Sequence, residues 1–144
     1  MTYRTVAPAT CAALLALAAC RGTTAPENVA GSYTLRSIDG ASLPVSLKPS
    51  SSWHTDVVAG TLELDDKAAF TYSIQVREMA DTPTGTTVRT VWVIQTGTYT
   101  RKGGALTLAG DGDWRFQATV GGAGITVLDD WDADIGNDQL LFVR

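Results

Sequence analysis

Alternation of apolar and polar side chains is the feature that most limits how this chain can fold. Along Ala69 to Arg77 the apolar positions are Phe70, Tyr72, Ile74 and Val76, and the polar ones are Thr71, Ser73, Gln75 and Arg77. Successive side chains of a strand point to opposite faces, so this segment is predicted to be a strand with one core face and one solvent face. After residue 30, no window of helical length carries an apolar stripe at a 3.6-residue spacing. The alternation therefore predicts an all-β domain.

The segment from Thr86 to Gln95 alternates in the same way but has apolar residues on both faces. Val88, Trp92 and Ile94 share one face, and Arg89, Val91, Val93 and Gln95 share the other. We expect the larger side chains, Trp92 and Ile94, to face the core, and the strand to be covered on both sides.

Shorter alternating runs raise the number of strand candidates to about nine. They are Gly31 to Ile38, Val57 to Leu64, Gly97 to Arg101, Ala105 to Ala109, Trp114 to Val120, Gly124 to Leu128 and Gln139 to Arg144. Turn sequences such as Asp39-Gly40 and Lys102-Gly103-Gly104 separate them, and loops this short join neighbouring antiparallel strands. A barrel or a sandwich fits this pattern. Because closure removes exposed edges, we expect a small up-and-down β-barrel of eight or nine strands without a major helix.

The barrel interior is predicted to be bulky and aromatic. The inward set is Tyr33, Leu35, Leu62, Leu64, Phe70, Tyr72, Ile74, Val76, Trp92, Ile94, Tyr99, Leu106, Leu108, Trp114, Phe116, Ile125, Val127 and Phe142. About eight strands enclose either a side-chain core or one small ligand. In the second case the candidate ligand-binding residues are Tyr33, Trp53, Tyr72, Trp92, Tyr99 and Trp114. The long segment from Asp39 to Asp56, which carries Leu43, Val45 and Leu47, either covers such a ligand or plugs the core.

The N-terminal residues have the features of an export signal. A start with one charge, Arg4, is followed by Ala12 to Ala19, which contains only Ala and Leu. The sequence Leu17-Ala18-Ala19-Cys20 resembles the lipobox of bacterial lipoproteins. This resemblance implies that residues 1–19 are removed and that Cys20 carries the lipid, including acyl chains such as palmitate. An ordinary secretory signal, with Cys20 incidental, is the alternative.

Residues 20–30 are predicted to form a flexible tether between the lipid and a domain that spans residues 31–144. The tether is polar and contains Pro26. The expected location is the cell envelope, with membrane attachment through Cys20. Because Arg21 rather than Asp follows the cysteine, the lipoprotein resemblance implies the outer membrane in a host with two membranes. Removal of Cys11 with the signal leaves one cysteine and no internal disulfide.

Charge and composition exclude several function classes. Without Arg4 there are ten Lys and Arg residues against fifteen Asp and Glu residues, which disfavours nucleic acid as a partner. The one histidine, His54, lies near Ser50, Ser51, Ser52 and Asp56, which are too close in sequence to form a triad spontaneously. A zinc ligand set is also missing. We therefore expect neither catalysis nor a cofactor.

An acidic segment offers a candidate metal site. Seven of the fifteen carboxylates lie between Asp111 and Asp138. Asp130, Asp132 and Asp134 have the alternate spacing that begins a Ca²⁺-binding EF-hand loop, although Gly136 comes one place late and Leu141 replaces the bidentate Glu. The alternative is a solvated acidic hairpin end, and Asp111 and Asp113 contribute to a Ca²⁺ site only if the fold brings the two loops together.

Several short motifs resemble lipocalin-like domains of bacterial lipoproteins. They are Gly31-Ser32-Tyr33-Thr34-Leu35, Asp39-Gly40, Leu43-Pro44, Gly60-Thr61-Leu62-Glu63-Leu64, Gly97-Thr98-Tyr99 and Leu140-Leu141-Phe142-Val143-Arg144. In those families an Arg near the end of the barrel packs on an aromatic residue of the first strand. The resemblance thus implies a cation-π contact between Arg144 and Tyr33, and a solvated Arg144 is the alternative.

These observations predict a membrane-anchored envelope lipoprotein with a non-catalytic binding domain. Its partner is a small apolar ligand or an envelope component such as an envelope protein. The alternative is a solid barrel that acts as a structural or protein-interaction module.

Overall fold

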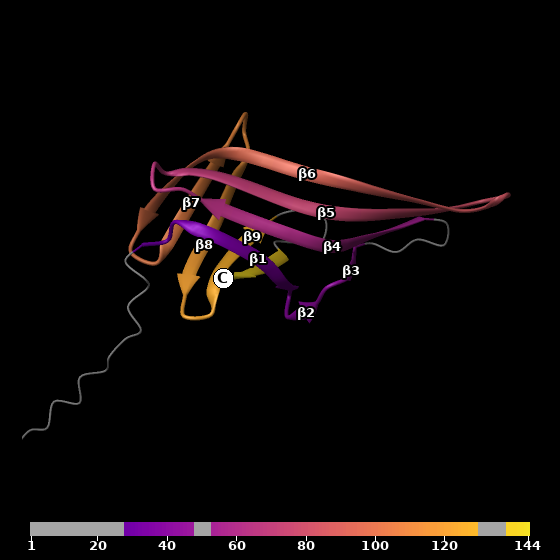
Figure 1. The fold of residues 1–144 in the computed structure, drawn as a ribbon, viewed down its shortest axis with the longest axis horizontal. Helices are drawn as coiled ribbons and strands as arrows, with labels where there is room; N and C mark the ends of the chain where they lie inside the picture. The colour runs from indigo at the N-terminus through magenta and orange to yellow at the C-terminus, as the bar shows by residue number, and fades with distance from the viewer. Residues whose placement is uncertain (1–27, 48–52, 130–137) are drawn as a thin grey trace, which may run out of the picture.

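The computed structural model describes residues 28–47, 53–129 and 138–144. These residues form strands, turns and connecting segments and contain no helix, so none of them supplies a helix that could span a membrane. The strands are β1 (Gly31–Ile38), β2 (Ala41–Ser42), β3 (Val45–Leu47), β4 (Trp53–Leu64), β5 (Ala69–Thr82), β6 (Gly85–Lys102), β7 (Ala105–Gly110), β8 (Arg115–Gly121), β9 (Gly124–Asp129) and β10 (Asp138–Val143) (Figure 1). The predicted all-β class is confirmed.

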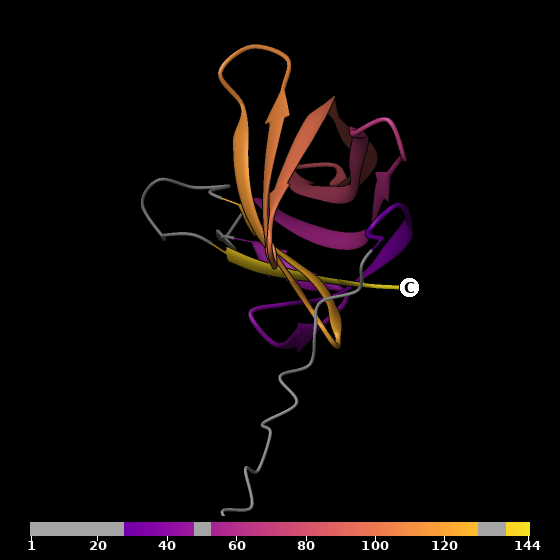
Figure 2. The same cartoon turned by 90° about the vertical axis from the view of Figure 1, so that its left-hand side faces the viewer.

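Eight of these strands close into an antiparallel up-and-down barrel. From β4 to β10 each strand pairs with the next in sequence, and β1 closes the ring by pairing with both β10 and β4. Figure 2 shows the strands curving around a common interior. The short strands β2 and β3 are additions that pair with β1 and β4 respectively. The closed barrel therefore encloses a single core of side chains.

The core confirms most of the predicted inward set. Tyr72 lies at its centre, with ring centroids 5.2 Å from Phe116 and 5.9 Å from Phe142. Leu43, Val45 and Leu47 pack against this core while remaining partly exposed. Of the two alternatives for the segment from Asp39 to Asp56, a ligand cover or a plug of the core, these three residues agree with the plug.

Two irregularities explain core residues that simple alternation does not predict. The pairing of β4 with β5 shifts between Val57 and Ala59, so that Val57 and Leu62 both face the core although their numbers differ in parity. The pairing of β1 with β10 shifts in the same way between Leu35 and Ser37. Ile38 is consequently buried along with Leu35.

At Gly97 the backbones of β6 and β7 approach each other closely. A Cβ atom at this position would overlap the carbonyl oxygen of Ala109 and the Cα of Gly110. Only glycine leaves room for this backbone contact. The pairing of β6 with β7 runs from Gly97 to Lys102 and joins the second half of β6 to the barrel.

The β5–β6 hairpin is longer than predicted. The two runs at Thr86 to Gln95 and Gly97 to Arg101 form the single strand β6, and β5 continues to Thr82. Their pairing extends without a register shift to Thr82 and Gly85. We call residues 78–89 the arm. β4 pairs with it as far as Ala80, and Figure 1 shows the tip of the hairpin projecting beyond the other barrel strands.

The barrel begins before Gly31, inside the predicted tether. Val29 is buried, and its carbonyl accepts a hydrogen bond from the Tyr33 hydroxyl at 2.8 Å. Residues 28–30 therefore belong to the folded domain. Cys20 lies outside the described residues.

Candidate functional site

The middle of the barrel is filled by side chains. The largest fully buried ones are Tyr72, Phe142, Leu62, Ile74, Leu106, Leu108, Ile125, Leu140, Val57 and Val127. Each exposes less than 2 % of its surface, as expected of side chains in a closely packed core. Of the candidate ligand-binding residues, Tyr72 is part of this packing. Tyr33 is also a buried core residue, but it lies where Arg144 covers its ring.

The prediction that Trp92 and Ile94 point inward is wrong. Trp92 is 51 % exposed and Ile94 is 56 % exposed. The register pairs the buried side chains of Ile74 and Val76 with Val93 and Val91, so the odd-numbered residues of β6 face the core. Because β5 already supplies bulky side chains to the interior, the smaller apolar face of β6 fits there.

The other candidate aromatic residues lie at separate places. Trp53 is 51 % exposed at the start of β4, beside the arm, where it lines an open hollow of about 260 Å³ with the paired side chains of Glu78 and Arg89. Trp114 is half exposed, with its ring centroid 6.0 Å from that of Phe116. The prediction that it lies in the core is wrong, because it precedes β8 and the packed middle of the barrel is already full.

Tyr99 is partly buried against the core, and its hydroxyl donates to the Asp65 carbonyl at 2.7 Å. Burial, assisted by the negative charge of Asp65, raises the pKa of its hydroxyl. The structure therefore does not bring the six candidate aromatic residues together in one ligand site.

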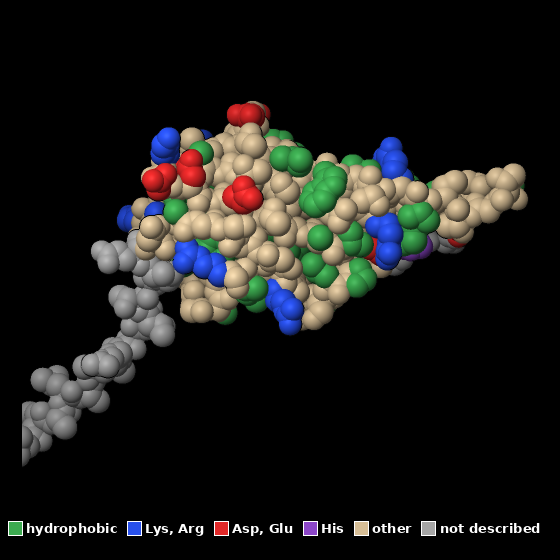
Figure 3. All heavy atoms as spheres, in the orientation of Figure 1, with side chains coloured by type: hydrophobic (Ala, Val, Ile, Leu, Met, Phe, Trp, Pro, Cys, Tyr) green, Lys and Arg blue, Asp and Glu red, His purple; other side chains and the backbone are tan. Residues whose placement is uncertain are grey.

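An apolar surface is present on the outside of β6 instead. Val88 is 61 % exposed, and its side chain lies on the same face as those of Trp92 and Ile94. We call these three residues the outer patch. Figure 3 shows hydrophobic side chains gathered over β5 and β6 on this face. The patch continues along the strand toward the arm.

The same part of β6 has an unpaired backbone edge. β7 pairs with β6 only from Gly97 to Lys102, and the amide of Asp111 donates to the Thr96 carbonyl at 3.3 Å. Before Thr96, no described residue other than those of β5 pairs with β6. We call β6 residues 86–94 the free edge. Sequence alternation does not reveal such an edge, because it depends on where β7 leaves β6.

A polar row crosses three strands beside the arm. The side chains of Arg77 and Ser46 both donate hydrogen bonds to Asp56, that of Arg77 at 2.6 Å. The side chain of Asp56 is only 8 % exposed. These two hydrogen bonds, the larger effect being that of Arg77, lower the pKa of the Asp56 carboxyl below its usual value of 3.8. The row stabilises the sheet.

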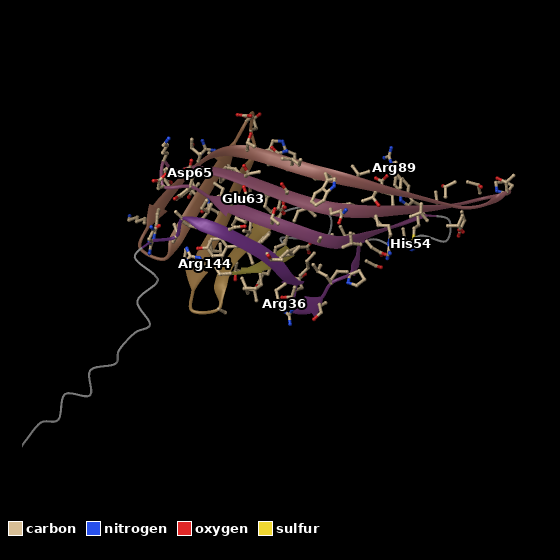
Figure 4. The ribbon with its side chains drawn as sticks, viewed as in Figure 1. Arg36, His54, Glu63, Asp65, Arg89 and Arg144 are labelled. Atoms are coloured by element: carbon tan, nitrogen blue, oxygen red, sulfur yellow. The ribbon has the colours of Figure 1, made fainter. Side chains whose placement is uncertain are left out.

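The residues considered for catalysis and metal binding form no cluster within the described part of the chain. Figure 4 shows His54 beside the arm, on β4, and its strand neighbour Asp56 is engaged with Arg77. Ser50, Ser51 and Ser52 lie outside the described residues, as do Asp130, Asp132 and Asp134. Among residues 28–47, 53–129 and 138–144, no three His, Cys, Asp or Glu side chains gather where they could hold a metal ion.

The predicted contact between Arg144 and Tyr33 is confirmed. The guanidinium carbon of Arg144 lies 5.0 Å from the centroid of the Tyr33 ring. The same guanidinium donates to the Ala30 carbonyl at 2.6 Å. Arg144 thereby connects the end of the chain to the start of β1 (Figure 4).

The residues that the structure describes thus form a small β-barrel with the lipocalin-like fold, a filled middle and two added strands. Comparison with protein-family models, with curated proteins and with solved structures finds no match to the chain. Any assignment of function must therefore come from its own residues.

Proposed function

We propose that this chain is a lipid-anchored cell-envelope protein whose barrel binds an envelope component through its outer surface, without catalysis. The main support for this proposal is a contrast: side chains fill the middle of the barrel, whereas Val88, Trp92 and Ile94 of the outer patch are exposed. The lipobox-like sequence that ends at Cys20 supports the anchor.

The position of the aromatic side chains favours a macromolecular partner over a small ligand held inside the barrel. The fully buried residues leave no room for a ligand beside them. Trp92 sits outside, next to the polar Gln75 of β5. Large exposed apolar side chains with polar neighbours are typical of interaction surfaces, and Trp is enriched among residues that dominate binding energy.

The anchor is tested by replacing Cys20→Ser in the full chain and separating membranes from soluble proteins. We expect the parent chain in the membrane fraction, labelled by radioactive palmitate, and the variant in the soluble fraction without label. If the variant stays with the membranes as the parent does, the proposed anchor is wrong.

The surface is tested by placing a photoreactive amino acid at position 94 or, as a control, at position 119 in the full chain. Thr119 is exposed, but β8 is paired on both sides there. Illumination of cells should give an adduct of defined mass, different from twice the mass of the chain, from position 94 and none from position 119. Equal adducts from both positions, or none from position 94, would contradict the proposed surface.

A further inference from the structure

The free edge of β6 presents a regular series of backbone groups with which no described strand pairs. The amide of Tyr99 donates to Ala68 on the β5 side, whereas the carbonyl of Thr96 accepts from Asp111 on the opposite side. Backbone groups alternate in direction along a strand, so odd residues of β6 bond to β5 and even residues point away from it. The outward-directed N–H and C=O groups belong to Thr86, Val88, Thr90, Trp92 and Ile94.

This edge has little of the usual protection against strand pairing. Natural edge strands carry Lys, Pro, bulges or inward-pointing charges that prevent pairing with another chain. Residues 85–96 contain no Lys and no Pro, and their pairing with β5 has no register shift. Their one charged residue, Arg89, is on the core-side face of β6, but Glu78 neutralises it through an ion pair at 2.6 Å. The remaining residues are mostly Thr, Val, Ile and Trp, which favour strands.

We propose that two copies of this chain pair antiparallel through the free edge, about a two-fold axis at Thr90, and form a dimer with one continuous sheet. This inference goes beyond the proposed function and requires neither the lipid on Cys20 nor an envelope partner. The occupant is a second copy because the edge is complementary to itself: in this register all five residues with outward-directed backbone groups pair with one another.

The side chains also match in this register. Val88 lies opposite Trp92 of the second copy, a pairing of β-branched and aromatic residues, and Thr90 lies opposite Thr90 of the second copy. Arg89 lies opposite Val91 of the second copy, so no like charges face each other directly. The pairing supplies about ten inter-strand hydrogen bonds and brings the two outer patches together on one face.

The test begins with the full chain in detergent, studied by analytical ultracentrifugation over a wide range of concentrations. Thr90→Pro removes the outward amide at the axis but spares the bonds to β5, because the amide of residue 90 points away from that strand. Thr90→Val keeps the amide and serves as the matched control. We expect Thr90→Pro to raise the dimer dissociation constant at least about tenfold, because both copies lose a hydrogen bond at the axis, and Thr90→Val to change it by less than about threefold.

A cysteine variant tests the same pairing independently, even if Thr90→Pro fails to fold. In a regular antiparallel pair, opposite Cα atoms lie about 4.5–5.5 Å apart, within reach of a disulfide. Under mild oxidation, Thr90→Cys should give a covalent dimer in which mass spectrometry joins two peptides that each contain position 90, and Thr119→Cys should not. A monomer at all concentrations, a dimer that Thr90→Pro leaves intact, or equal cross-linking at both positions would overturn the proposal.

Experiments can separate a failure of the proposed dimer from a failure of the proposed envelope binding. A photo-adduct from position 94 with twice the mass of the chain reports the dimer, whereas one of another mass reports an envelope component. Loss of membrane attachment in Cys20→Ser leaves the dimer unaffected. The two proposals therefore fail separately.

Discussion

The two halves of β6 differ in their surroundings although they belong to one strand. At Gly97 and Thr98 the strand is paired on both sides, with β5 and β7, and Gly97 permits close contact with the β7 backbone. From Thr86 to Ile94 it carries the outer patch and, among the residues that the structure describes, is paired with β5 alone. The presence or absence of a second neighbouring strand, here β7, therefore decides whether a part of β6 closes the barrel or is open to a binding partner. The alternation of side chains does not reveal this difference.

The largest contrast is expected between aromatic truncations in the core and on the free edge. Phe142→Ala removes a ring that is fully buried beside Tyr72 and should lower the free energy of unfolding by about 3–5 kcal/mol. Trp92→Ala removes a half-exposed ring and should change it by less than about 0.5 kcal/mol at monomer concentrations. Urea unfolding followed by circular dichroism measures both. Similar losses would mean that the two regions are not as different as proposed.

A glycine substitution tests the part of β6 that is paired with both β5 and β7. Gly97→Ala forces a Cβ atom against the Ala109 carbonyl and should cost about 1–3 kcal/mol. Gly121→Ala is the control, because a Cβ atom there meets nothing within 4 Å. If the two variants unfold at the same denaturant concentration, the close contact between β6 and β7 is not a constraint.

The polar row beside the arm predicts a dependence of stability on pH. Asp56→Asn should cost about 1–2 kcal/mol near neutral pH, because it weakens the bond to the partly exposed Arg77. The lowered pKa of Asp56 means that its contribution is complete above the usual value of 3.8 and is lost as the pH falls through the lower folded-state value. Thermal unfolding from pH 7 to pH 2 should therefore show a smaller gap between parent and variant in acid. A gap that stays constant contradicts this role.

The smallest expected effect lies at the end of the chain. Arg144→Gln removes the cation-π contact with Tyr33 and should cost about 0.5–1 kcal/mol. Arg36→Gln, at an exposed position of β1, should change stability by less than the error of the measurement. Thermal unfolding compares the two, and equal shifts would argue against a specific contact.

Much of the barrel could be predicted from the sequence because burial on one face imposes a period of two. The alternation places Tyr72 and Phe142 in the core, and both are buried. The same alternation does not predict that Val57 and Ile38 are buried. Pairing shifts in β4 and β1 exchange the inward and outward positions along each strand, and the sequence pattern does not indicate these shifts. The closure of the ring is expected from the short loops and is confirmed.

The candidate site was harder to predict because β6 is apolar on both faces. Side-chain size favours Trp92 for the core, but the space opposite Val76 is occupied by Val91. That choice depends on the volume already supplied by other strands. The free edge depends on where β7 departs, and the pairing of Asp56 with Arg77 depends on β4 starting at Trp53, within a segment expected to be a loop.

Amide hydrogen exchange along β6, followed by NMR at low and high protein concentration, reports whether the free edge is open in the monomer and paired in the dimer. The amides of the odd residues Arg89, Val91 and Val93 bond to β5 and should be protected at both concentrations. The amides of Thr90 and Trp92 should exchange rapidly in dilute solution and become protected in concentrated solution, where the dimer forms. Protection of these amides at every concentration would show that another segment covers the edge. Rapid exchange at every concentration would show that the edge remains unpaired, and either result would contradict the account.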